Sequence, residues 1–150
     1  MEEKAMDSGK GKIKVAWVEP DHQRRIMLQH WAEIPEDGFA EGICRLIGAK
    51  SLGCAPYSAG GAEYCCWHDL DAAMRDGPIV PTAIIPADFE GGLPIVLCGA
   101  IAFTSAGADG RPASLGPGDC AEIMRQLLAD QPRLKEYISR MEYFARRAGL

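Results

Sequence analysis

LPIVLCGAIAF, residues 93–103, is a run of eleven residues without a single charge. A run of this length is too short to cross a bilayer, and it is typical of a strand that is buried on both faces. Glycines at 91–92 and the turn residues at 105–110 bound it on both sides. The pattern predicts one central strand over 93–103 against which the other elements pack.

The composition describes an ordinary globular chain. Of its 150 residues 47% are hydrophobic and 25% charged, which is enough to build one domain with its own core. The formal net charge of −5 argues against nucleic-acid binding, because such binding needs a broad basic face. The N-terminal segment lacks the apolar core of a signal peptide, and no run is long enough to span a membrane. We therefore expect a cytoplasmic protein whose six cysteines are free thiols.

Alternating runs and turn residues in the first half predict two hairpins and one internal helix. Residues 1–11 are expected to form a mobile tail and residues 12–150 a single α+β domain. The expected strands cover 13–19, 25–30, 50–55 and 62–67, with the last two joined through 56–61. Four apolar residues at helical spacing predict a helix over 36–47 that stops at Gly48: Phe39, Ile43, Leu46 and Ile47.

The second half predicts an edge segment and a two-part C-terminal helix. Prolines within 78–86 exclude that segment from a central strand. After a turn near 109–110, a helix capped by Ser114 or Asp119 is expected to be interrupted at Pro132 and to continue as a helical extension over 132–150. Its apolar stripe is expected to pack on the sheet, and the alternative is pairing with a second copy in a homodimer.

Together these elements predict an α+β fold. The sheet is expected to be mainly antiparallel or mixed and built from β-hairpins, with the internal helix and the two-part C-terminal helix packed on one face.

Three blocks of the sequence carry a family resemblance: KVAWVEP at 14–20, FAEGICRLIGAKSLGCAP at 39–56, and LPIVLCGAIAFTSAGADGRPASLGPGDC at 93–120. The most specific piece is Cys98-Gly99 in an apolar strand, followed by Phe103 and by Ser114-Leu115. These blocks resemble domain-of-unknown-function family 3846, an uncharacterised family of small bacterial and phage proteins. The resemblance implies an α+β fold, a cytoplasmic setting and an origin on phages, plasmids or gut bacterial genomes. It implies no activity, ligand or catalytic residue.

The cluster Cys65-Cys66-Trp67-His68 raises the question of a metal site. Cys65 or Cys66 would have to join His68 and Cys54 to supply the ligands that zinc needs. Adjacent residues on a strand point to opposite faces, so only one of the paired cysteines can do so. The sequence has no C-x-x-C pair and no second histidine nearby. The spacing therefore favours structural thiols, and we expect neither a metal nor a cofactor.

Trp67, His68, Asp69 and Arg111 are the candidate ligand-binding residues. Trp67 suits stacking on a base, and His68-Asp69 has the composition of a general base with an orienting carboxylate. Arg111 precedes the start of a helix, where free amides favour anions, although Asp119 would compete for those amides. No P-loop, nucleophile elbow or dinucleotide fingerprint accompanies these residues.

Two functions follow from these features. The first is a small cytosolic accessory protein of bacterial, phage or mobile-element origin that binds a host protein or a small ligand. The alternative is an enzyme that handles nucleotides or small molecules at a site around Trp67–Asp69. The lack of a coherent catalytic set favours the binding protein.

Overall fold

The computed structural model describes residues 11–21, 26–74, 80–87, 89–142 and 146–147. The mobile tail expected over 1–11 lies outside these residues except for Gly11, whose carbonyl accepts a hydrogen bond from the Glu36 amide. Of the C-terminal extension expected over 132–150, residues 143–145 and 148–150 also lie outside.

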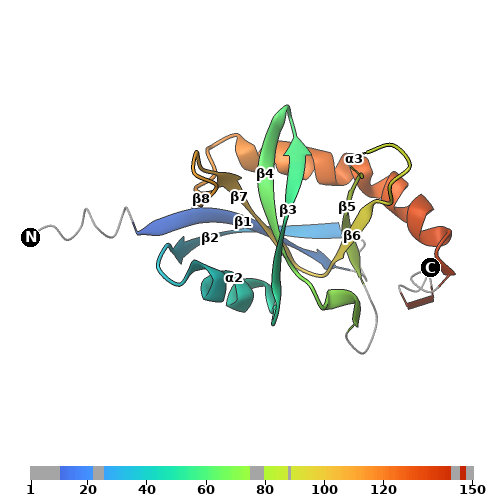
Figure 1. Cartoon of the computed structure of the whole chain (residues 1–150), viewed down its shortest axis with the longest axis horizontal. Helices are drawn as coiled ribbons and strands as arrows, with labels where there is room; N and C mark the ends of the chain where they lie inside the picture. The colour runs from blue at the N-terminus through green and yellow to red at the C-terminus, as the bar shows by residue number, and fades with distance from the viewer. Residues whose placement is uncertain (1–10, 22–25, 75–79, 88, 143–145, 148–150) are drawn as a thin grey trace, which may run out of the picture.

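A six-stranded antiparallel sheet forms the middle layer of the molecule (Figure 1). Its strands lie in the order β2 (Ile26–Pro35), β1 (Lys12–Asp21), β7 (Ile101–Ala106), β4 (Ala62–Asp69) and β3 (Leu52–Ala59), and β8 (Pro112–Ala113) pairs with β7. The predicted α+β class and the two predicted hairpins, β1–β2 and β3–β4, are confirmed.

The β3–β4 hairpin is longer than expected. Only Gly60 and Gly61 form its turn, with φ angles of 58° and 82°, and the residues assigned to the connection continue strand β3. Pro56 is tolerated there because β3 lies at the edge of the sheet, where one side of the strand needs no backbone donor.

The central strand predicted over 93–103 is wrong, because it is two strands in two different sheets. β6 (Ile95–Cys98) pairs with β5 (Pro81–Ile85) in a separate two-stranded sheet, whereas β7 lies in the middle of the large sheet. Gly99 separates them with a φ of 74°, a conformation that glycine adopts without a steric penalty. Its amide donates to the Val80 carbonyl at 2.8 Å and so fixes the corner. The proline-rich segment over 78–86 was expected to be an edge segment or an extended loop, and its described part forms the edge strand β5, with residues 78–79 outside the described residues.

The internal helix α2 (Phe39–Ile47) covers one face of the sheet. It begins three residues later than predicted, because Gly38 adopts the left-handed conformation at its N-cap, and it ends at Gly48 as predicted. The glycine at position 42, inside the helix, is explained by packing. A Cβ atom there would lie 2.6 Å from Ile34 Cγ2, so glycine lets the helix approach β2 closely.

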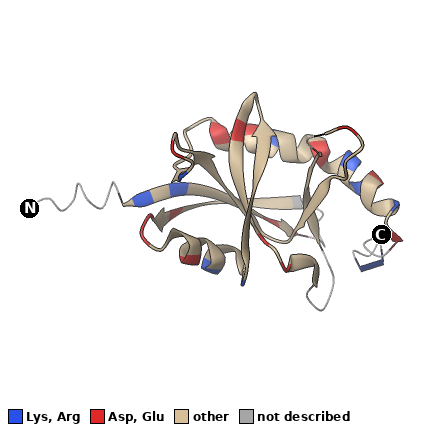
Figure 2. Cartoon of the chain, in the orientation of Figure 1, with Lys and Arg blue, Asp and Glu red and all other residues tan. Residues whose placement is uncertain are grey.

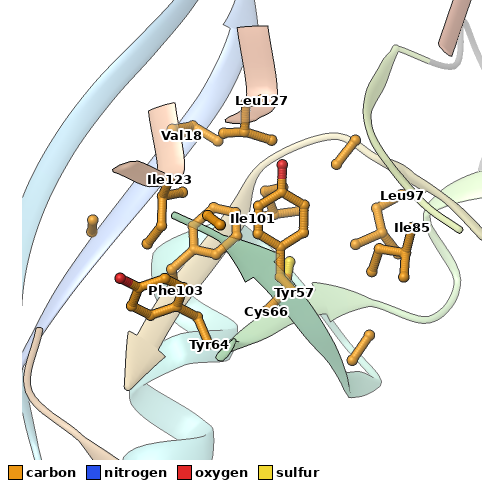
Figure 3. Packing of buried hydrophobic residues seen from close by; sticks show 14 of the residues in the cluster. Val18, Tyr57, Tyr64, Cys66, Ile85, Leu97, Ile101, Phe103, Ile123 and Leu127 are labelled. Atoms are coloured by element: carbon orange, nitrogen blue, oxygen red, sulfur yellow. The ribbon is translucent and has the colours of Figure 1, made fainter. Parts of the chain in front are cut away.

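The C-terminal helix α3 (Asp119–Ser139) packs on the opposite face, together with the β5–β6 hairpin (Figure 1). The expectation that both helices share one face is therefore wrong. Both faces of β1 carry apolar side chains, which explains why both faces of the sheet are covered. Val15 packs with the buried side chains of α2, whereas Ala16 and Val18 pack with those of α3. Figure 3 shows the core beneath α3, where Ile123 and Leu127 lie over side chains of the central strands.

The interruption predicted at Pro132 is also wrong, because α3 continues through it to Ser139. Leu134 and Ile138, beyond the proline, are buried against Ile84 of β5. The side-chain amide of Gln131 donates to the carbonyls of Leu127 at 3.0 Å and Thr82 at 3.2 Å, which ties the helix to β5 at this turn. Leu134 and Ile138 of the apolar stripe thus pack on the two-stranded sheet. Phe144 and Ala145 of the same stripe lie outside the described residues, and pairing with a second copy stays a prediction.

Neither of the two predicted caps bonds the first turn of α3. The Ser114 hydroxyl accepts the Lys14 amide at 2.8 Å, and the Leu115 amide donates to the Lys14 carbonyl at 3.1 Å. Asp119 accepts a hydrogen bond from the Tyr64 hydroxyl at 2.7 Å. These side chains fasten the β8–α3 connection to strands β1 and β4.

A candidate ligand-binding recess

A recess of about 410 Å³ opens on the α2 side of the sheet. We call it the α2 recess. It is lined by residues from four separate segments of the chain: Ile13, Glu36, Phe39, Ala40, Trp67, Arg111 and Pro112. Its volume falls in the range typical of small-molecule sites.

The sheet creates this recess because its strands separate there. β7 pairs with β1 over Ile101–Phe103 but with β8 over Ser105–Ala106, so β8 takes the place of β1 at this end. The connection between β7 and β8 therefore carries Arg111 to the same side as the start of α2.

Trp67 forms the aromatic wall and is held in place by its neighbours. Its indole N–H donates to the hydroxyl of the fully buried Thr104 at 3.0 Å. Its ring meets Phe39 edge-on, with centroids 5.3 Å apart. The indole is therefore oriented before any ligand binds.

Arg111 supplies the positive charge of the recess. Its Nε lies 3.1 Å from Asp109 Oδ2, and its backbone amide donates to Asp109 Oδ1 at 3.0 Å. This ion pair uses Nε and leaves the two terminal nitrogens of the guanidinium for a ligand. The side chain is 76% exposed, so water screens the pair. Glu36 adds a carboxylate to the same recess.

The structure separates the other two candidates from Trp67. Alternation along β4 turns His68 toward the α3 side, the side of Cys66, whereas Trp67 packs in the α2 cluster. His68 lies over Gly53 of β3, where a Cβ atom would be 2.8 Å from the His68 ring. Burial lowers the pKa of His68 below 6.5, although Asp69 opposes this shift.

Asp69 has a structural role in the turn that follows β4. It is buried, and its carboxylate accepts the amide hydrogen of Asp71 at 3.1 Å. It does not line the α2 recess, so the structure brings together two of the four candidates, Trp67 and Arg111.

The thiols of the β3–β4 hairpin are free, as are the other cysteines. Cys54 is exposed at the edge of the sheet, and partial burial of its thiol, followed by the neighbouring Cys65, raises its pKa. Burial also raises the pKa of Cys66 well above its ordinary value. Protonated thiols are poor nucleophiles and poor metal ligands. In the described residues, no three His, Cys, Asp or Glu side chains lie close enough together to hold a metal ion.

Sequence reasoning missed the contributions of Glu36 and Phe39, which it assigned only to a helix. No local pattern marks them, because the recess forms from segments that meet only in the folded chain. Among the described helices, none is long and apolar enough to cross a membrane. No family model matches the sequence, and neither a curated protein nor a solved structure matches it significantly.

Proposed function

We propose that this chain is a small accessory protein of bacterial, phage or mobile-element origin that acts by binding a small ligand in the α2 recess. One observation carries the proposal. A fixed indole wall at Trp67 and the guanidinium of Arg111, forty-four residues apart in the sequence, line the same recess. An apolar wall with a few convergent polar groups is the usual composition of a ligand site.

The lining side chains restrict the chemistry of the ligand. Trp67 and Phe39 suit a flat apolar body, Arg111 suits a carboxylate or phosphate, and Glu36 suits an amine. A zwitterionic aromatic compound, such as an aromatic amino acid or a short peptide, matches all three. Among the described residues that line the recess there is no histidine, cysteine or serine, which favours binding over catalysis.

Binding of a host protein is the second candidate. Several large apolar side chains are exposed on and before the β5–β6 hairpin: Leu70, Met74, Phe89, Leu93 and Ile95. Large exposed apolar side chains favour a protein partner, and they would also serve a homodimer. Light scattering of the purified protein distinguishes the two, because only the homodimer doubles the mass without an added partner.

A thermal-shift screen followed by calorimetry tests the small-ligand proposal. The panel contains aromatic amino acids, aromatic dipeptides, mononucleotides and their uncharged analogues. We expect an aromatic zwitterion to bind, and Arg111→Gln to weaken it about tenfold through loss of a charge-assisted hydrogen bond. Arg125→Gln is the matched control, because Arg125 is also exposed and ion-paired but lies on α3.

Three results would count against the proposal. Failure of every zwitterion to bind would remove it, and so would equal losses in the Arg111 and Arg125 variants. The third result is binding of a nucleotide that is abolished by His68→Gln but not by Arg111→Gln. It would place the ligand site around His68 and Asp69, as in the alternative enzyme function, and not in the α2 recess.

A further inference from the structure

A second recess of about 300 Å³ lies between the turn of the β5–β6 hairpin and the second half of α3. We call it the hairpin groove. Residues of the hairpin form one wall and residues of one helix face form the other: Ile84, Pro86, Ala87, Phe89, Gly92, Pro94, Arg133, Glu136, Tyr137 and Arg140. It shares no residue with the α2 recess.

The hairpin wall is apolar and compact. A Cβ atom at Gly92 would lie 2.8 Å from both Ala87 Cβ and Phe89 Cζ, so the turn closes only with glycine at this position. Phe89 is nevertheless 67% exposed, and it faces a groove whose other side carries the ring of Tyr137. Two aromatic rings and two prolines thus line a space that is open to solvent.

The helix wall carries an excess of positive charge. Arg133 and Arg140 lie two turns apart in α3 and line the groove together with Glu136. Figure 2 shows both acidic and basic residues along α3. Glu136 pairs with Arg140 at 3.1 Å, whereas Arg133 forms no ion pair within the described part of the chain. Among the described residues that line the groove, Arg133 therefore carries a guanidinium without a carboxylate partner, although the whole chain has a net charge of −5.

We infer that the hairpin groove binds a small aryl carboxylate. The aromatic ring would lie among Phe89, Tyr137 and the prolines, and the carboxylate would accept hydrogen bonds from the Arg133 guanidinium. This pairing is favoured because a planar guanidinium matches the two oxygens of a carboxylate, so that two parallel hydrogen bonds can form. A neutral aryl compound would gain the ring contacts alone.

Titration calorimetry with 1-naphthylacetate and its uncharged analogue 1-naphthylacetamide tests the inference on the full chain. We expect the carboxylate to bind about tenfold more tightly than the amide, which corresponds to one charge-assisted hydrogen-bonding group. In Arg133→Gln the affinity for the carboxylate should fall to that for the amide, while the affinity for the amide stays the same. Phe89→Ala should weaken both ligands equally.

Two control variants distinguish binding in the hairpin groove from a general charge effect and from binding in the α2 recess. Lys135→Gln removes the same charge from an exposed position of α3 outside the groove, so it should leave both affinities unchanged. Arg111→Gln should leave the binding that depends on Arg133 unchanged, because the Arg111 side chain lines the α2 recess. Any carboxylate bound in the α2 recess would instead be lost in Arg111→Gln and kept in Arg133→Gln, so the two proposals can fail independently. Equal binding of acid and amide, or an equal effect of Lys135→Gln and Arg133→Gln, would overturn the inference. Absence of binding by both compounds would do the same.

Discussion

Replacing Pro132 with alanine should stabilise the protein. The position lies inside α3, with helix before and after it, and its ring is exposed, so the substitution removes no packing. Alanine restores a backbone N–H that can donate to the Leu128 carbonyl and removes the clash between the ring and that carbonyl. If the chain instead formed two helices separated at this point, proline would fit the break and its loss would not help.

The expected change in the free energy of unfolding is the gain from removing the proline minus two smaller losses. A proline in a helix interior costs about 3 kcal/mol relative to alanine. Leu128 is 58% exposed, so water can already satisfy part of the hydrogen bonding that its carbonyl lacks, and alanine makes the unfolded chain more flexible at a cost of about 0.4–1 kcal/mol. We expect a net gain of about 1–2 kcal/mol in the free energy of unfolding, or a rise in Tm of about 2–8 °C for a chain of this size.

Urea denaturation followed by circular dichroism measures this change, with the slope m expected to stay constant. Pro117→Ala is the control, because Pro117 lies in an exposed turn outside any helix, where the same substitution should lose about 0.4–1 kcal/mol. Opposite signs for the two variants support a continuous α3. A loss of stability in Pro132→Ala, or no change, would refute the reasoning.

Four other substitutions, in three experiments, test the packing of α3 and the burial of side chains on the sheet. Leu127→Ala should cost about 3 kcal/mol and Leu128→Ala less than about 1 kcal/mol by urea denaturation, because the first side chain is fully buried and the second 58% exposed; equal losses would contradict the packing of this helix. Tyr64→Phe should cost about 1.5–3 kcal/mol in the same assay, since it removes the hydrogen bond to the Asp119 carboxylate, and an unchanged midpoint would show that this bond adds nothing. Burial lowers the pKa of His68 below 6.5, so the unfolded chain binds a proton more readily than the folded one. Stability should therefore fall as the pH drops below about 6.5, and His68→Gln should flatten that part of the pH profile; an unchanged profile would contradict the shift.

Local sequence signals were sufficient for most of the elements. Alternating runs between turn residues identified both hairpins of the large sheet, and the apolar stripe with its terminal glycine identified α2. These signals work because a strand period of two and a helix period near 3.6 are local properties of the backbone. The α+β class follows from such local periods, and the structure has that class.

The pairing of these elements depended on contacts between distant residues. Residues 93–103 are apolar throughout, so composition does not show that Gly99 turns the chain from one sheet into another. The local effect of Pro132 favours a break, but burial of Leu134 and Ile138 against Ile84 holds the helix together. In both places tertiary packing outweighs the local preference.

In the candidate site, too, the sequence indicates the chemistry of single residues, whereas the fold determines which residues meet. Residue chemistry alone selected Trp67 and Arg111, since an indole and a guanidinium are common in ligand sites. Strand alternation turns His68 and Trp67 to opposite faces of the sheet, so these two neighbours do not share one recess. Only the fold joins Arg111, Glu36 and Phe39 to Trp67, because β8 replaces β1 beside β7 and carries the arginine across. A sequence specifies which side chains are available, whereas the separation of strands in space determines which of them surround a single cavity.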